Sequence, residues 1–111
     1  MPFSSRPVHE IKANLFRVLG HPARVRILEL LRDGERSVGA LQVELGLDSG
    51  GTSQHLGALK QIGLVEARRE GTSVFYSVPD PHVFELLAAG RAIITRRLAE
   101  QQALLKDLET A

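Results

Sequence analysis

The stretch of residues 51–78, GTSQHLGALKQIGLVEARREGTSVFYSV, places the tightest limit on the fold of this chain. Its first part has apolar side chains at helical spacing, and Gly63 ends that helix. Two β-rich runs follow, residues 65–69 and 73–78, and between them Gly71 supplies the positive φ that a tight hairpin needs. The stretch therefore predicts a helix that leads directly into a β-hairpin.

Three more helices are predicted ahead of this stretch. Apolar spacing predicts the first over about residues 8–19. His21 is placed to cap a second helix that begins at Pro22, and the nearly continuous apolar character of that helix makes it the expected centre of the core. Ser37 is expected to cap a third helix, and Ser49 the helix that precedes the hairpin. With a last helix after the hairpin, the fold class is mainly α with a small β-hairpin wing, in the order ααααββα.

The last predicted helix, about residues 81–108, is roughly 40 Å long at 1.5 Å per residue. Apolar side chains repeat along it at intervals of three and four, over more length than the preceding 80 residues can cover. Pairing with a second copy, helped by the first helix, is the expected way to bury this surface. The alternative is one long helix folded back over its own domain. The predicted dimer-interface residues are Val8, Ile11, Leu15, Val83, Leu87, Gly90, Ile94, Leu98 and Leu105.

The composition is that of a single globular domain. The chain has 111 residues, 43% of them hydrophobic and 24% charged, so one domain over residues 1–111 is expected. A net charge of +1 neither favours nor excludes a nucleic-acid partner. Only the first twenty residues are unbalanced, with Arg6, Lys12 and Arg17 against Glu10.

Several classes of protein do not fit this sequence. The absence of cysteine removes disulfides, thiolate metal sites and thiol chemistry. No apolar run approaches the ~18 residues that span a bilayer, so no membrane partner is expected. The start has no secretory segment, and a cytoplasmic location is expected. No dinucleotide, phosphate-loop, zinc-protease or nucleophile-elbow motif occurs, so neither an enzyme nor a cofactor is expected.

The outer face of the helix before the hairpin carries the main indication of function. No carboxylate occurs between Ser49 and Gln61, and the outward positions hold hydroxyls, an amide, glycines and one lysine. Gln54 can bond adenine through two atoms, whereas a carboxylate on this face would be repelled by phosphates. The hairpin adds Arg68 and Arg69, a residue type that lies along phosphates or enters the minor groove. Together these features predict double-stranded DNA as the partner.

The predicted DNA contacts come from this helix and the wing. They are Ser49, Gly51, Thr52, Ser53, Gln54, His55, Gly57, Lys60, Arg68, Arg69 and Thr72. Two interpretations of His55 stay open, because it lies at the edge of the inward face of its helix. It either supports the structure there or donates an imidazole N–H to a phosphate.

Four motifs, in order along the chain, carry a resemblance to a known family. They are His21-Pro22-Ala23-Arg24, VRILELL, SVGALQVELGL and TSQHLGALKQIGLVEARREGTSVFYSV. Over about residues 11–87 the chain resembles the ArsR/SmtB winged helix-turn-helix repressors. The resemblance implies a homodimer, joined by its first and last helices, that lays one helix of each subunit in a major groove with the wing beside it. It also implies repression of nearby promoters and release of DNA when a small ligand, often a metal ion, binds.

The metal sites that the resemblance implies are not filled here. Thiolate-type members carry two cysteines at the start of the third helix, where this chain has Ser37 and Gly39. A second family site takes an Asp and a His two residues on, which Asp80 and His82 match as weak candidates. The other half of that site falls on residues that cannot ligate a cation, Ile93 and Arg96. Since zinc takes four ligands, or three with an open position, no metal is expected.

The predicted function is a homodimeric, sequence-specific DNA-binding repressor whose effector is a non-thiol, non-metal small molecule, or which has no effector. One alternative is a winged-helix module that binds proteins without binding DNA, since one fold supports several functions. The other is a metal-responsive repressor with a rearranged site. The operator and the regulated genes are left open.

Overall fold

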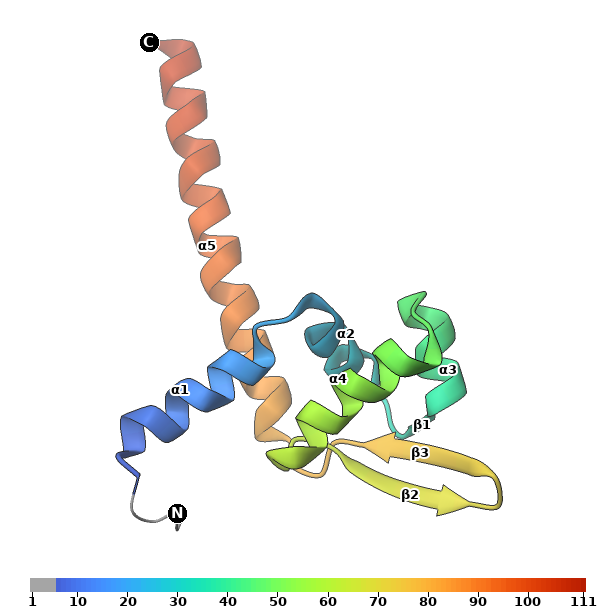
Figure 1. Cartoon of the computed structure of the whole chain (residues 1–111). Helices are drawn as coiled ribbons and strands as arrows, with labels where there is room; N and C mark the ends of the chain where they lie inside the picture. Colours follow the sequence, from blue (N-terminus) through green and yellow to red (C-terminus); the bar gives the residue numbers. More distant parts are fainter. Residues whose placement is uncertain (1–5) are drawn as a thin grey trace. The chain divides into compact units, whose positions relative to one another are not determined.

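The computed structural model describes residues 6–111, and it divides into a first unit that runs up to Pro81 and a second unit from His82 onward (Figure 1). The elements in chain order are α1 (Val8–Leu19), α2 (Pro22–Leu30), β1 (Arg36–Ser37), α3 (Val38–Leu45), α4 (Ser49–Gln61), β2 (Glu66–Glu70), β3 (Ser73–Ser77) and α5 (His82–Thr110). The predicted helices and hairpin are thus all present, and the structure adds one short strand.

The core of the first unit forms around α2. Ile27 and Leu28 have no exposed surface, as the apolar character of this helix predicts. The predicted cap is also confirmed, because the Ala23 backbone N–H donates to His21 Nδ1 at 3.2 Å. Pro22 follows in the first turn, where its missing N–H would have had no partner. The other buried apolar side chains of this unit are Val18, Leu19, Leu30, Leu31, Leu41, Leu56, Leu59 and Val65.

A short turn joins α3 to α4. The predicted cap of α3 is confirmed, since Ser37 Oγ accepts a backbone N–H of the first turn at 3.1 Å. α3 ends at Gly46, whose φ of 65° favours glycine. The predicted cap of α4 is wrong by one residue: Asp48 Oδ1 accepts the Gly51 N–H at 2.7 Å, and Ser49 is already helical. Both residue types cap well, so the choice depends on where the turn ends, which the sequence pattern does not fix.

The wing is a three-stranded antiparallel sheet in the order β1-β3-β2. β2 and β3 pair from Glu66 opposite Ser77 to Glu70 opposite Ser73, and Gly71 in the connecting loop has a φ of 62°. The predicted hairpin is therefore confirmed. β1 pairs with the other edge of β3 and was not predicted, because a strand of two residues is too short to show an alternating pattern.

α5 is a single helix of 29 residues, about 43 Å long. Most of its large apolar side chains beyond the first turns are more than half exposed, from 54% to 69%. These exposed residues are Ile93, Ile94, Leu98, Leu104, Leu105 and Leu108. Within residues 6–111, no helix is long and apolar enough to cross a membrane.

The residues predicted for a dimer interface differ in exposure within the single chain. Val8 is 65% exposed, and Ile94, Leu98 and Leu105 are each more than half exposed. Val83 differs from them, since it is only 7% exposed. The remaining members are half-buried: Ile11, Leu15, Leu87 and Gly90. The exposed members are the ones that offer surface to another molecule.

Candidate nucleic-acid interface

α4 has one face in the core and one face in solvent. Thr52, Leu56 and Leu59 are buried, as the helical spacing predicts. Thr52 was also among the predicted DNA contacts, and that prediction is wrong. Its side chain has no exposed surface, and its Oγ1 donates to the Asp48 carbonyl oxygen at 2.9 Å. Thr52 therefore strengthens the first turn of α4 instead of reaching a ligand.

The solvent face of α4 is polar and free of carboxylates. Its exposed residues are Ser49, Gly50, Ser53, Gln54, Gly57, Lys60 and Gln61. A Cβ built on Gly57 would meet nothing within 4 Å, so a partner can approach the backbone closely at this point. Gly51 differs, because a Cβ there would lie 3.1 Å from Asp48 Oδ1. The structure thus gives Gly51 a role in the cap of the helix.

A hollow of about 450 Å³ opens beside this face, between α4, the start of α3 and the wing. It brings together Ser53 of α4 and Thr72 of the wing loop, two residues predicted as DNA contacts from separate parts of the sequence. The other residues that line it are Ser37, Val38, Gly39, Ser73, Val74 and Tyr76. Hydroxyl groups thus dominate the polar lining, and none of the lining residues is acidic. No sequence pattern pointed to Ser73 or Tyr76, because their shared position depends on the fold.

Arg68 is engaged in contacts on one face of the wing. Its Nε and Nη2 donate to the Glu35 carboxylate, and its Nη1 donates to Glu70 Oε2 at 2.8 Å. The guanidinium also lies 4.9 Å from the centre of the Phe75 ring. The hydrogen bond from Arg68 lowers the pKa of Glu35, and the hydrogen bonds to Glu35 and Glu70 raise the pKa of Arg68. Arg68 therefore ties β2 to the segment before β1 through a charged network.

Arg69 lies on the opposite face of the same strand, since neighbouring residues of a strand point to opposite sides. Its cross-strand partner is Val74, and residues directly opposite in an antiparallel pair share a face. Val74 lines the hollow beside α4, so Arg69 belongs to the face of the wing that bounds it. Arg69 forms no hydrogen bond or ion pair with residues 6–111. Both arginines were predicted as DNA contacts, and the structure gives them different surroundings on opposite faces of the strand.

His55 is held from behind by the start of α2. Arg24 Nε donates to His55 Nδ1 at 3.2 Å, and Arg24 Nη1 donates to the Val18 carbonyl oxygen at 3.1 Å. The His21 and His55 ring centres are 4.2 Å apart. Burial first, and then the nearby His21 and Arg24, lower the pKa of His55 below its ordinary value of 6.5. These contacts favour the supporting role among the two interpretations of His55, and they leave Nε2 as the N–H donor of a neutral ring.

Metal-ligating residues do not cluster in the described part of the chain. Within residues 6–111, no three or more His, Cys, Asp or Glu side chains lie close enough to hold an ion together. Ser37 and Gly39, at the positions where thiolate-type relatives carry cysteine, line the hollow beside α4. His82 lies near Glu85, with 4.0 Å between His82 Nε2 and Glu85 Oε2.

Comparisons with known proteins agree with this architecture. The profile of the family described as "Bacterial regulatory protein, arsR family" matches residues 21–67, from the start of α2 into β2. The HTH-type transcriptional regulator Rv0081 of Mycobacterium tuberculosis is 47% identical over 105 residues, which cover 94% of this chain and 92% of that protein. The biofilm growth-associated repressor of Xylella fastidiosa is 38% identical over 77 residues, 69% of this chain and 68% of the repressor.

Solved structures extend the similarity to three dimensions. The crystal structure of Rv0081 from M. tuberculosis matches with a TM-score of 0.80 at 46% identity, and the match covers 87% of this chain and 98% of that one. The solution structure of the homodimeric winged helix-turn-helix DNA-binding domain Mb0332 from Mycobacterium bovis matches with a TM-score of 0.73 at 36% identity, over 82% of this chain and 84% of that domain. With this identity over most of both chains, the protein belongs to the arsR family of bacterial regulatory proteins.

Proposed function

We propose that two copies of this DNA-binding regulator form a homodimer that places α4 of each copy in successive major grooves of an operator and represses transcription there. The observation that carries the proposal is the carboxylate-free solvent face of α4. A helix that faces only water commonly carries acidic and basic side chains in pairs. Hydroxyls, amides, glycines and one lysine suit a surface of phosphates and base edges instead.

The DNA contacts proposed for each copy come from α4 and one face of the wing. Gln54 reads a base edge, and the neighbouring Ser53 and Lys60 meet phosphates or guanine. Arg69 and Thr72 bring the wing to the backbone of the duplex, beside the hollow. Arg68 acts as a positioning residue, because its donors are already used by Glu35 and Glu70.

The dimer is supported by the surface of α5. Exposed side chains on α5 recur with the spacing by which helices pair: Ile94, Leu98, Leu105 and Leu108 follow at intervals of four, seven and three residues. Burying one such side chain stabilises an interface by roughly 1.5–3 kcal/mol, before the cost of association is subtracted. The Mb0332 domain of M. bovis is homodimeric in solution, which supports the same assembly for this chain.

The proposed repression is supported by the name of a relative. The relative in X. fastidiosa is named a repressor, and the chain here shares 38% identity with it. The proposed effector is an unidentified small molecule that is not a metal, because the chain has no cysteine and has Ile93 and Arg96 where half of the second family site would need ligands. The proposed place of action is DNA in the cytoplasm.

Fluorescence anisotropy with a labelled duplex from the promoter region next to the protein's own coding sequence tests the function. The proposal predicts binding whose affinity falls steeply as salt rises, because phosphate contacts release counterions. Absence of binding at low salt, or binding with no dependence on salt, would favour a winged-helix module that binds proteins.

A further inference from the structure

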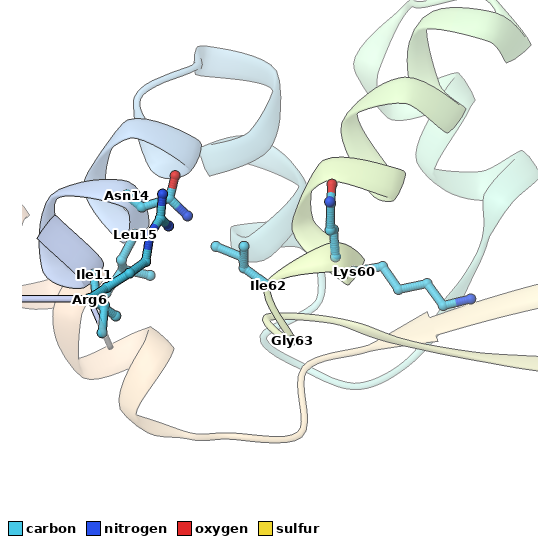
Figure 2. A pocket seen from close by; sticks show the side chains of 8 residues that line it. Arg6, Ile11, Asn14, Leu15, Lys60, Ile62 and Gly63 are labelled. Carbon is cyan, nitrogen blue, oxygen red and sulfur yellow. The ribbon is translucent and has the colours of Figure 1, made fainter. Parts of the chain in front are cut away.

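A pocket of about 480 Å³ lies between α1 and the end of α4, and Lys60 is the one proposed DNA contact among its lining residues (Figure 2). Its volume is within the range of roughly 300–1,000 Å³ that small-molecule sites occupy. The residues that line it are Arg6, Ile11, Asn14, Leu15, Lys60, Gln61, Ile62 and Gly63. None of them is acidic. The proposed DNA contacts leave this pocket unexplained.

The lining divides into an apolar part and a polar part. Ile11, Leu15 and Ile62 supply half-buried aliphatic surface from both sides of the gap. In Figure 2 the Arg6 guanidinium lies next to Asn14 on the α1 side, and the Lys60 ammonium points away from the pocket. The polar end of the pocket is therefore made by Arg6 and Asn14, and Lys60 contributes only the base of its side chain.

The orientation of the Asn14 amide is fixed by its neighbour on α1. Asn14 Oδ1 accepts from Arg17 Nε at 3.1 Å and from Arg17 Nη2 at 2.7 Å. With its oxygen used by Arg17, Asn14 presents its Nδ2 as a donor, and Figure 2 shows that nitrogen directed toward the gap between α1 and α4. Arg6 and Asn14 together thus offer a cation and a neutral N–H donor at this end of the pocket.

A second hollow of about 460 Å³ continues over α1 and shares Arg6 and Asn14 with the pocket. It is also lined by Glu10, Ala13 and Arg17. Two arginines therefore face one glutamate around Asn14, and this surface corresponds to the basic excess of the first twenty residues of the sequence. The local charge favours an anionic group at this end of the pocket.

We propose that this pocket binds a small amphipathic carboxylate, with the carboxylate on Arg6 and Asn14 and the apolar body on Ile11, Leu15 and Ile62. Charge-assisted hydrogen bonds from a guanidinium to a carboxylate are among the stronger ones in proteins. The pocket is the site for the small-molecule effector, and this regulatory consequence rests on the proposed function.

The position of the pocket at the end of α4 gives the ligand a route to DNA binding. Ile62 and Gly63 follow α4 directly, and Gly63 ends the helix with a φ of 79°. The Gly63 N–H donates to the Lys60 carbonyl oxygen and the Leu64 N–H to the Leu59 carbonyl oxygen, each at 3.0 Å. A ligand in the pocket contacts both α1 and this end of α4. It changes the affinity for DNA to the extent that it binds the DNA-bound protein more or less tightly than the free protein.

The test uses the full chain and two probes with the same apolar body, octanoate and 1-octanol, in ¹⁵N-resolved NMR titrations without DNA. Octanoate is expected to shift the signals of the Asn14 side-chain amide and the Gly63 backbone amide, and to bind more tightly than 1-octanol. Arg6→Gln is expected to weaken octanoate binding roughly tenfold, the size of one charged hydrogen bond, and to leave 1-octanol binding unchanged. Arg32→Gln, an exposed arginine outside the pocket, is the matched control and is expected to bind octanoate like the unaltered chain.

Three results would overturn the proposal. The first is no shift of either signal with millimolar octanoate, and the second is equal binding of octanoate and 1-octanol. The third is octanoate binding by the Ile94→Glu variant but not by the unaltered chain. That result would mean that the partner copy covers Ile11 and Leu15, which are also predicted interface residues, in the dimer. DNA binding is measured separately by anisotropy, so a failure of the pocket leaves the proposed function standing, and a failure of DNA binding does not alter the titration.

Discussion

α4 and α5 present opposite surfaces to solvent. α4 buries Leu56 and Leu59 and exposes a polar face without a carboxylate. α5 exposes large aliphatic side chains such as Ile94 and Leu98, and its charged residues include both signs. A surface without acids suits an anionic partner, whereas exposed aliphatic side chains suit an apolar one. In the proposed assembly, one short chain thus keeps a surface for DNA separate from a surface for its own second copy.

The largest effect is expected from Ile94→Glu, which places a charge within the exposed aliphatic row of α5. An unpaired charge buried in the seam would cost several kcal/mol, so the variant is expected to sediment as a monomer and to bind an operator duplex at least 100-fold more weakly. The matched control is Ala103→Glu, which adds the same charge to an exposed position of α5 outside that row. Analytical ultracentrifugation gives the oligomeric state. An Ile94→Glu variant that remains dimeric would place the seam elsewhere.

Gln54→Ala tests whether the polar face of α4 reads bases. Loss of a bidentate base contact is expected to cost about 1–3 kcal/mol on the preferred duplex and much less on a scrambled duplex, so that base preference relaxes. Competition anisotropy with both duplexes measures the difference. If the affinity for the two duplexes falls equally, Gln54 does not read the base sequence.

Asp48→Ala tests how the start of α4 is held. Because Asp48 Oδ1 accepts the Gly51 N–H, the substitution is expected to lower the free energy of unfolding by ~0.5–2 kcal/mol. Ser49→Ala is the matched control and is expected to change it little, since Ser49 is inside the helix. Urea denaturation measures the free energy of unfolding of both variants. A larger loss of stability in Ser49→Ala than in Asp48→Ala would contradict the observed cap.

Arg69→Gln and Arg68→Gln separate the two faces of the wing. Arg69→Gln is expected to weaken binding to all duplexes by the same factor. It is also expected to reduce the slope of log affinity against log salt concentration by about one. Arg68→Gln is expected to leave that slope unchanged, because its guanidinium is used by Glu35 and Glu70. The slopes come from anisotropy at several salt concentrations. Equal reduction in both variants would show that Arg68 leaves its carboxylates to meet DNA.

The smallest effect concerns His55 and pH. Since the folded chain lowers the pKa of His55 below 6.5, the unfolded chain takes up the proton first as pH falls. The stabilising contribution of the neutral ring is therefore complete above about pH 6.5 and is lost as pH falls through the lower pKa of the folded state. Urea unfolding between pH 7.5 and pH 5 is expected to show a smaller decline in His55→Gln than in the unaltered chain. An equal decline would contradict the effect.

Most of the fold follows from local patterns in the sequence. Apolar spacing, together with His21 and Ser37 as caps and Gly71 in the hairpin loop, predicts the helices and the wing. β1 was not predicted, because it forms only by pairing with β3, whose residues lie about forty positions further along the chain. The cap of α4 was displaced by one residue because Asp48 and Ser49 have nearly equal capping preference.

The site was less predictable than the fold, because its assignments depend on side-chain partners from other elements. Thr52 is an exception, because the spacing within its own helix, with Leu56 and Leu59, was enough to place it in the core. Arg68 and Arg69 are adjacent and chemically identical, and they are distinguished by the partners of Arg68, which are Glu35 in a different segment, Glu70 and the Phe75 ring. A sequence pattern does not show which side chains from other elements will become partners.

Gly57 offers the most direct test of whether the solvent face of α4 meets DNA. This position is exposed and open, so Gly57→Gln and Gly57→Glu introduce side chains of nearly equal size that differ in charge. In anisotropy at low salt, Gly57→Glu is expected to bind the promoter duplex at least tenfold more weakly than Gly57→Gln, since like charges face each other across the interface. Equal affinity of the two variants, with both still folded and dimeric, would contradict the assignment of this face to DNA.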